Sequence, residues 1–321
     1  MLDEKIRQPR IGGSEIAAIF GRHDFLDEFG LWARKKGDLP REQDGPSMAR
    51  MRLGKHLEQG IVSYAAELQG WRYEWSDKTV RSEEYPFMVS TPDALMPEIR
   101  WGIDAKLVGW DQAWRWGRSV DHIPDHVVMQ AWWYMAHFHY DGWYVAALIM
   151  GEDTPRIYPI PRDPEAERII LRRGKAWWER YLVGDERPPI TASRESDTWL
   201  RRHHPRPTRA DIVVANPDQS EILDEYAQVR RDWASIDKRR QDLEAEIKAA
   251  IGDREGLRWP GGKFTWKLTK DWIRVDWEEL AKILVERHPA GAQLQKEFTY
   301  TKPGSRRIYY KSARGEEMEM L

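Results

Sequence analysis

Three ionisable side chains near the middle of the chain have the types and spacing of a metal-dependent phosphodiesterase site. Asp93 follows a Ser-Thr-Pro run, and ten residues later the chain reads Ile103-Asp104-Ala105-Lys106. Two carboxylates can hold a hard divalent cation, which stabilises the charge on a phosphate under attack and activates water. A nearby lysine offsets charge and orients the water. The pattern predicts phosphodiester hydrolysis by Asp93, Asp104 and Lys106, with the Ala105 carbonyl as a further metal ligand.

Asp104 and Lys106 are expected to lie on one face of a strand. Residues 99–107 alternate in the way that a strand requires, so these two side chains point the same way. A turn around 96–98 is expected to fold a strand at 87–90 back against it, which would bring Asp93 near Asp104. An acid-x-lysine on a strand is also compatible with a surface ion pair. The Thr-Pro-Asp at hairpin distance favours a functional site.

The elements that must position these residues follow from hydrophobic periodicity. Helices are expected from Ser14 to about Gly21 and at 48–69, 124–139 and 164–182, and strands near Val80 and at 87–90, 99–107, 143–150 and 156–160. The 48–69 helix carries an apolar stripe of Leu53, Leu57, Ile61, Tyr64 and Leu68. Glu58 lies at the edge of this stripe and is the natural fourth metal ligand or a ligand to a second metal. The order of elements indicates a mixed α/β domain with a central sheet.

The chain divides into three parts by composition. A core domain spans 1–185, a basic and proline-rich linker 186–212, and a C-terminal extension 213–321. In the extension, apolar residues from Ile222 to Ala250 recur at spacings of four and three, interrupted once by Arg240, which predicts a helical hairpin arm or a coiled coil. A small α+β segment follows, with a strand at 263–268, a helix at 276–288 and a final strand at 306–311.

Composition excludes several classes of protein. The chain has 321 residues and a formal net charge of -2, so no global basic character marks it as a nucleic-acid binder. It has no cysteine, which excludes disulfides, thiolate zinc sites and iron–sulfur clusters and fits a reducing cytoplasm. No apolar run approaches the roughly 18 residues of a membrane span, so neither export nor insertion is expected. The 18 tryptophans suit packing, and some also suit stacking on bases.

Five short motifs occur in a fixed order along residues 5–185. They are Ile11-Gly12-Gly13-Ser14-Glu15-Ile16, Gly54-Lys55-His56-Leu57-Glu58, Ser90-Thr91-Pro92-Asp93-Ala94-Leu95, Ile103-Asp104-Ala105-Lys106, and Gln130 with Tyr134. This ordered set resembles the phage lambda-type alkaline exonuclease and YqaJ-like viral recombinase branch of the PD-(D/E)xK nuclease superfamily.

The resemblance implies a fold, a reaction and partners. It implies a restriction-endonuclease-like core that uses Mg²⁺, with Mn²⁺ as a substitute, to digest one strand of linear double-stranded DNA from a 5′ end, leaving 3′ single strands for recombination. It implies catalytic roles for Lys106, Asp93, Asp104, Glu58 and Gln130, with Gln130 beside the attacking water. Arg7 and Ser14 correspond to residues that receive the terminal 5′-phosphate, and Thr91 and Tyr134 are further DNA contacts. The implied partners are DNA ends, a single-strand annealing protein and other copies in a trimeric ring, in the cytoplasm of a bacterial host and of phage or prophage origin.

Two departures and several alternatives accompany the resemblance. Asp104 stands where lambda-type enzymes usually have glutamate, and they lack the extension beyond about 212, which could clamp DNA, join subunits or recruit the annealing protein. Ser14 could also be a plain helix cap. Another nuclease of the same fold, Cas4-like, RecB-like or an endonuclease, is the nearest alternative, although Cas4-like enzymes commonly hold an iron–sulfur cluster. A catalytically inactive DNA-end-binding scaffold is the other, and the intact Asp93, Asp104 and Lys106 disfavour it.

Overall fold

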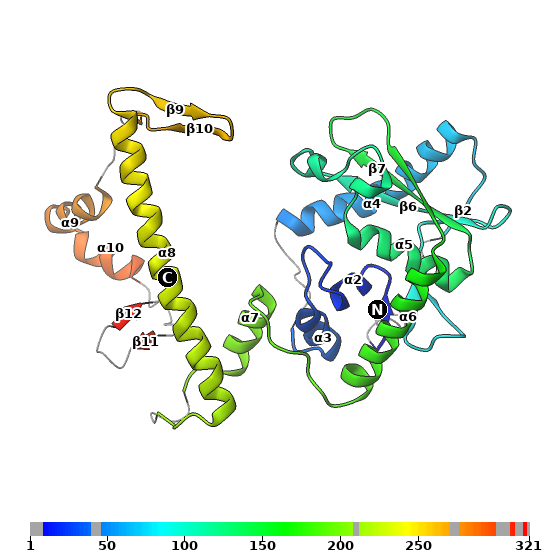
Figure 1. The fold of residues 1–321 in the computed structure, drawn as a ribbon, viewed down its shortest axis with the longest axis horizontal. Coiled ribbons are helices and arrows are strands. Elements are labelled where there is room, and N and C mark those ends of the chain that lie inside the picture. The colour runs from blue at the N-terminus through cyan, green and yellow to red at the C-terminus, as the bar shows by residue number, and fades with distance from the viewer. Residues whose placement is uncertain are drawn as a thin grey trace. The chain divides into compact units, whose positions relative to one another are not determined.

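The computed structural model describes residues 9–39, 46–76, 78–207, 212–269, 276–299, 309–311 and 317–319 (Figure 1). The chain forms two compact units, Met1–Pro205 and Arg206–Leu321. Within the described residues, no helix combines the length and the apolar character that a membrane crossing requires.

The first unit is built on a five-stranded mixed sheet. Its strands are β2 (Glu74–Trp75), β5 (Ala94–Met96), β6 (Trp101–Val108), β7 (Gly142–Ile149) and β8 (Arg156–Pro161), in the order β2-β5-β6-β7-β8. Only β6 and β7 run parallel, because a helix connects them, and the other neighbours are antiparallel. The expectation of a mixed α/β domain with a central mixed sheet is confirmed.

The predicted hairpin partner of β6 is wrong. The strand at 87–90 appears as β4 (Met88–Ser90), but it belongs to a separate small sheet with β1 (Ile11–Gly12) and β3 (Val80–Arg81), in the order β1-β4-β3. The strand that folds back on β6 is the short β5, with Ala94 opposite Ile103. Asp93 directly precedes β5, so the carboxylate still arrives beside β6.

The helices of the first unit are α2 (Ile16–Ile19), α3 (Glu28–Lys36), α4 (Pro46–Gln69), α5 (Asp125–Phe138), α6 (Pro164–Trp177), which continues as a π-helical turn at Trp178–Val183, and α7 (Arg194–His203). Helix α4 packs on one face of the large sheet and α5 on the other. Two 3₁₀ helices, η1 (Trp110–Arg115) and η2 (Val120–His122), lie between β6 and α5. Ser14 does not start a helix as predicted, because α2 begins at Ile16 with Glu15 as its N-cap residue.

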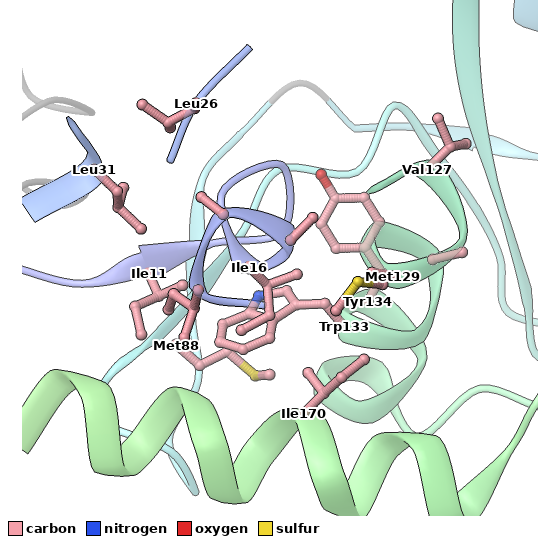
Figure 2. Packing of buried hydrophobic residues seen from close by; sticks show 14 of the residues in the cluster. Ile11, Ile16, Leu26, Leu31, Met88, Val127, Met129, Trp133, Tyr134 and Ile170 are labelled. Carbon is pink, nitrogen blue, oxygen red and sulfur yellow. The ribbon is translucent and has the colours of Figure 1, made fainter. Parts of the chain in front are cut away.

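Two buried clusters define the layers. On one face of the sheet, Ile61 and Ala65 of α4 pack with Ile103 and Ala105 of β6. On the other face, α5 packs in a larger cluster around Trp133 and Tyr134, together with Ile16 of α2 and Ile170 of α6 (Figure 2). Alternation along β6 therefore points Asp104 and Lys106 toward α5, as the periodicity of 99–107 predicted.

The predicted apolar stripe of α4 is not its buried face. Leu53, Leu57, Tyr64 and Leu68 are exposed, whereas Ile61, Val62, Ala65 and Ala66 are buried. Of the predicted stripe, only Ile61 packs in the cluster that faces the sheet. Glu58 lies one turn before Val62 and therefore projects toward the same side of α4.

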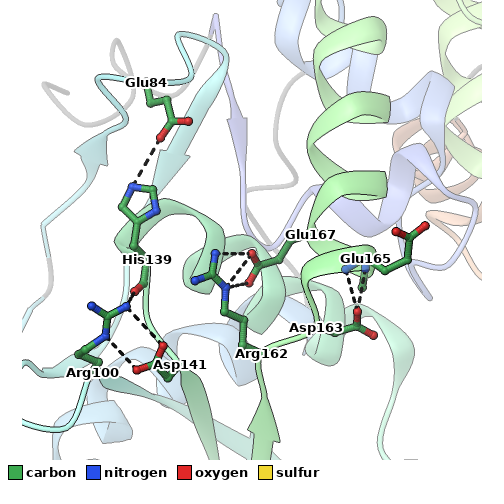
Figure 3. A network of polar contacts seen from close by, with 9 residues as sticks. Glu84, Arg100, His139, Asp141, Arg162, Asp163, Glu165 and Glu167 are labelled. Carbon is green, nitrogen blue, oxygen red and sulfur yellow. Dashed lines mark hydrogen bonds and ion pairs between the residues drawn. The ribbon is translucent and has the colours of Figure 1, made fainter.

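Ion pairs join the segments that flank β6, β7, β8 and α6 at one end of the sheet (Figure 3). The Arg100 Nε donates to Asp141 Oδ2 at 2.9 Å, which ties the start of β6 to the start of β7. Arg162, after β8, donates to both carboxylate oxygens of the buried Glu167 in α6 at 2.9 to 3.0 Å. Such bidentate pairs fix orientation as well as distance, so β6, β7, β8 and α6 keep a constant arrangement around the site.

The predicted linker contains an ordered helix. Within 186–212, α7 packs on α3 through Trp199, which contacts Phe29 and donates its indole N–H to Asp38 Oδ2 at 3.1 Å. Arg34 of α3 also pairs with Glu195 at 2.7 Å. The first unit therefore extends to Pro205 rather than ending at 185.

The second unit is dominated by one long helix, α8 (Pro217–Ile251). It starts at a reciprocal capping box between Asn216 and Gln219 and ends at Gly252, whose φ is +56°. The sequence 222–250 is thus one continuous helix and not a helical hairpin. The remaining elements are a hairpin of β9 (Gly256–Trp259) and β10 (Gly262–Thr265), α9 (Trp277–Arg287), α10 (Gly291–Phe298), and β11 (Tyr309–Lys311) paired with β12 (Glu317–Glu319). Residues 306–308 of the predicted final strand lie outside the described residues.

Candidate active site

A continuous chain of polar contacts links the predicted catalytic residues. Lys106 Nζ contacts the Asp104 carboxylate and donates to Gln130 Oε1 at 3.1 Å. Gln130 Nε2 donates to the Tyr134 hydroxyl at 2.8 Å, and this hydroxyl donates to the Thr91 carbonyl at 3.0 Å. The chain runs from β6 through α5 to the segment just before Asp93, so three separate elements hold one site.

Asp93 is bound to the strand that carries the other acid. Its Oδ2 accepts a hydrogen bond from the Ala105 N–H at 2.8 Å. The N–H and C=O of one strand residue point to the same edge, so the Ala105 carbonyl also faces the edge of β6 where Asp93 lies. The structure therefore gathers the two carboxylates and this carbonyl around the end of β5.

Burial and neighbouring charges shift the pKa values of Asp93 and Lys106. Asp93 is 8% exposed and Asp104 4%. Burial and the Asp104 carboxylate raise the pKa of Asp93 well above its ordinary value, although Lys106 acts in the opposite direction. Burial lowers the pKa of Lys106, but Asp104 and Asp93 raise it by more, so the net pKa lies above the usual one. Lys106 is therefore charged at neutral pH. Its single positive charge does not balance the negative charge of two carboxylates.

Glu58 lies within electrostatic reach of the cluster. Its charge raises the pKa of Asp93, although less than burial and Asp104 do. Its carboxylate is held by Lys55, one turn earlier on α4, at 2.6 Å. Among the described residues, no three His, Cys, Asp or Glu side chains converge as a ready-made metal cage. The oxygen donors in place are Asp93, Asp104 and the Ala105 carbonyl.

This donor set fits Mg²⁺. The cation is held in proteins by one or two carboxylates, with waters or substrate oxygens completing its coordination. A buried carboxylate pair with excess negative charge has the hard oxygen ligands and the charge that such a cation requires.

A glycine-rich turn presents Ser14 close to the same network. Glu15 Oε2 accepts the Gly12 N–H at 2.7 Å and pairs with the buried Lys35 Nζ at 2.6 Å. At Gly13 a Cβ would lie 2.5 Å from Cε1 of Tyr134, so only glycine allows this turn to approach the ring. Ser14 itself is exposed. Glu15 and Lys35 are contributors that the sequence reasoning missed, although Glu15 lies inside a recognised motif.

Thr91 also contacts Tyr134. Its carbonyl accepts from that hydroxyl, and its Oγ1 lies 2.9 Å from Thr79 Oγ1. Tyr134 therefore contacts both Thr91 and Gly13, the residue before Ser14. Arg7 lies outside the described residues.

A cleft of about 440 Å³ opens at the N-terminal end of α5, the helix that carries Gln130. Its lining includes His23, Asp24, Trp114, Arg115 and Asp125. Of the two exposed tryptophans of η1, Trp114 lines the cleft and Trp110 does not. Sequence reasoning missed this cleft, because it is formed by segments about ninety residues apart.

Asp24 and Arg115 of the cleft lining form a polar cluster with His126. Arg115 Nη2 pairs with Asp24 Oδ1 at 2.7 Å, and His126 Nδ1 lies 3.2 Å from Asp24 Oδ2. Burial and the neighbouring His23 lower the pKa of His126 to about 4. His126 is therefore neutral at physiological pH, one turn before Gln130 on α5.

The sheet order and the helices on both faces of the sheet form a restriction-endonuclease-like fold, in which Asp93, Asp104 and Lys106 lie together. The family model of the YqaJ-like viral recombinase domain matches residues 4–140, which include every predicted site residue. This match confirms the resemblance carried by the five motifs and supports a phage-type nuclease.

Solved structures of two exonucleases are similar to the chain. An alkaline exonuclease from Laribacter hongkongensis is 13% identical, with a TM-score of 0.45, over 56% of this chain and 92% of that one. A phage-related exonuclease from Haemophilus somnus 129PT is also 13% identical, with a TM-score of 0.42, over 54% of this chain and 93% of the other. No curated protein matches the sequence.

Proposed function

We propose that the protein is a Mg²⁺-dependent exonuclease that resects linear double-stranded DNA from 5′ ends and leaves 3′ single strands for phage-type recombination. The observation that carries the proposal is the buried Asp93 and Asp104 pair, joined to Lys106 and Gln130 within a YqaJ-like domain. Inactive scaffolds have no need of such a cluster, because burying two like charges costs folding free energy.

Each residue has a proposed role. Asp93, Asp104 and the Ala105 carbonyl hold the cation, with Mn²⁺ as a substitute, and Glu58 adds a ligand directly or through water. When bound, the cation supplies charge stabilisation at the scissile phosphate and lowers the pKa of a water. Lys106 and Gln130 orient the attacking water, since the 3.1 Å bond between them holds both side chains at one point.

The terminal 5′-phosphate is proposed to bind near Ser14, Thr91 and Arg7. Two hydroxyls and a guanidinium provide the donors that a phosphate dianion needs. The DNA strand would continue into the cleft beside α5, where the exposed Trp114 offers a stacking surface.

The proposed setting is the cytoplasm of a bacterial host. The partners are DNA ends, a single-strand annealing protein that takes the 3′ strand, and further copies of the chain in a trimeric ring. These partners rest on the resemblance to the lambda-type enzymes.

The first experiment is digestion of a linear duplex labelled at either its 5′ or its 3′ end, with Mg²⁺ or with EDTA, beside a covalently closed circle. Early Mg²⁺-dependent release of the 5′ label with the circle intact is the expected result. Cutting of the circle would indicate an endonuclease, and end binding without cleavage would indicate the inactive scaffold.

A further inference from the structure

The long helix α8 carries an apolar seam that the described part of the second unit leaves uncovered. The side chains of Ile222, Trp233 and Ile236 are each 66% exposed, Val229 is 57% exposed and Leu243 40%. Together with Tyr226, Arg240 and Ile247 they form a series with alternating spacings of four and three, which places them on one narrow stripe. Isolated exposed apolar residues are ordinary, but a continuous stripe marks a surface that binds a partner.

We propose that two copies of the chain pair along this seam as an antiparallel coiled coil of α8 helices. The stripe from Ile222 to Ile247 is about 38 Å long at about 1.5 Å per residue. A strict stripe of this width fits another helix, because a globular partner would need a broader apolar face. The orientation and register follow from the side-chain sizes and charges along α8.

Side-chain size favours the antiparallel arrangement. In that arrangement Trp233 lies opposite Ile236 of the second copy, and Ile222 lies opposite Ile247, so each large side chain meets a smaller one. A parallel pair would instead place Trp233 against Trp233. The neighbouring core layers would then be filled only by smaller side chains and would pack less well.

Arg240, the charged residue of the seam, also favours the antiparallel arrangement. Parallel helices would bring the two Arg240 side chains together in the seam, whereas antiparallel helices place each one opposite Val229. Arg240 is also neutralised within its own helix, by Asp237 at 2.8 Å and Glu244 at 2.5 Å. Its aliphatic stem can therefore cover Val229 while its guanidinium stays in water.

Charges beside the seam select one register. With Trp233 opposite Ile236, Asp232 of each copy faces Arg239 of the other. A shift by one heptad toward the C-terminus would bring the two Arg239 side chains together, and a shift the other way would pair the two Asp232 side chains. Exposed pairs contribute little to stability, but they discriminate between registers.

Disulfide trapping tests the orientation, because the chain has no cysteine of its own. Full-length I222C and I247C variants, one of them carrying an affinity tag, are mixed and oxidised. We expect a crosslink between the two different variants. Crosslinking of I222C to itself would show a parallel pair, and failure of the mixed crosslink would likewise overturn the proposal.

Sedimentation velocity tests the pairing itself. I236D places a charge in the seam, whereas A245D places the same charge on the exposed opposite side of α8 and serves as the matched control. We expect I236D to halve the mass of the assembly and A245D to leave it unchanged, whatever association the nuclease unit has on its own. Equal masses for I236D and the unsubstituted chain would overturn the proposal. Cleavage is not measured, so the outcome is independent of the proposed function.

Discussion

At the scale of single residues, Asp93 and Asp104 are the same residue type but differ in whether a lysine pairs with the carboxylate. Asp104 is paired with Lys106, whereas Asp93 accepts the backbone N–H of Ala105, and burial raises the pKa of Asp93. A buried carboxyl group whose pKa is strongly raised is a mark of a functional site. The two positions should therefore respond differently to neutralisation.

We expect D93N to lose about 10³-fold or more in cleavage while raising the free energy of unfolding by about 1 kcal/mol, or roughly 2–4 °C in Tm. D104N should lose cleavage similarly but lower Tm, because it leaves Lys106 unbalanced. Thermal melts without metal and cleavage assays with Mg²⁺ measure both effects. A D93N protein that still cuts, or one that melts lower than D104N, would contradict the site assignment.

Mg²⁺ should stabilise the unsubstituted protein, since a ligand that binds only the folded state raises Tm. The rise should be absent in D93N and in D104N, and present in a control such as E67Q on the exposed side of α4. An equal rise in all four proteins would place the cation elsewhere.

We expect the fold to lose stability at acidic pH because of His137. Burial, and to a smaller extent His139, lower its pKa to about 4, and its Nδ1 lies 2.7 Å from Ser90 Oγ. Its unfolded pKa is about 6.5, so the unfolded chain takes up a proton first as the pH falls. The stability contribution is complete above about pH 6.5 and is lost between there and about pH 4. After allowance for solvent screening, the loss is about 1 to 2 kcal/mol.

H137Q should remove this part of the acid destabilisation. Denaturant unfolding at pH 7 and at pH 5 measures it, and the difference between the two pH values should be smaller in H137Q. An unchanged difference would mean that the imidazole is not held neutral by the fold.

At the scale of elements, the turn at residues 12–15 joins the N-terminal strand to the site. Glu15 and Lys35 fix the turn, and Tyr134 packs against Gly13. If Ser14 binds the terminal phosphate, S14A should reduce the preference for 5′-phosphorylated ends by about tenfold, the loss of one charge-assisted hydrogen bond. R7A should act in the same way.

The measurement is the ratio of cleavage rates on phosphorylated and unphosphorylated ends. S63A, on the exposed surface of α4, is the control and should leave the ratio unchanged. If S14A slows both kinds of end equally, the pocket lies elsewhere.

The 3₁₀ helix η1 offers a second test at this scale. Trp114 lines the cleft at α5, whereas Trp110 is similarly exposed and does not. Loss of one stacking interaction costs about 1–3 kcal/mol, so W114A should weaken binding of DNA ends by roughly 5- to 150-fold, with a smaller loss in W114F and none in W110A. Fluorescence anisotropy with D104N versions of these proteins measures binding without cleavage. Equal losses in W114A and W110A would argue against a path through the cleft.

At the scale of the whole molecule, the described site residues all lie in the first unit. Its core, its sheets and the α3–α7 contact lie within residues 9–205. A fragment of residues 1–205 should therefore unfold cooperatively and retain Mg²⁺-dependent cleavage. A folded fragment that binds DNA but cannot cut it would show that the second unit completes the active site.

Sequence alone determined the features that depend on short-range pattern. The alternation of 99–107 placed Asp104 and Lys106 on one face, because side chains of a strand have a period of two. The helical character of residues 222–250 was also predicted from their alternating spacings of four and three, although the sequence left open whether they form a helical hairpin or a coiled coil. The chemistry of a carboxylate pair and a lysine was likewise readable from residue types, and the motif order identified the family.

Only the tertiary structure decided which segments meet. The partner of β6 is β5 and not β4, because pairing depends on competition between strands that are distant in the chain. The buried side of α4 consists of Ile61, Val62, Ala65 and Ala66, so only Ile61 of the predicted apolar stripe packs on the sheet. Tyr134 bridges Gln130 to Thr91, and α7 joins the first unit, through contacts more than forty residues apart. Local patterns encode residue chemistry and element type, whereas a site built from several elements exists only once long-range packing has brought them together.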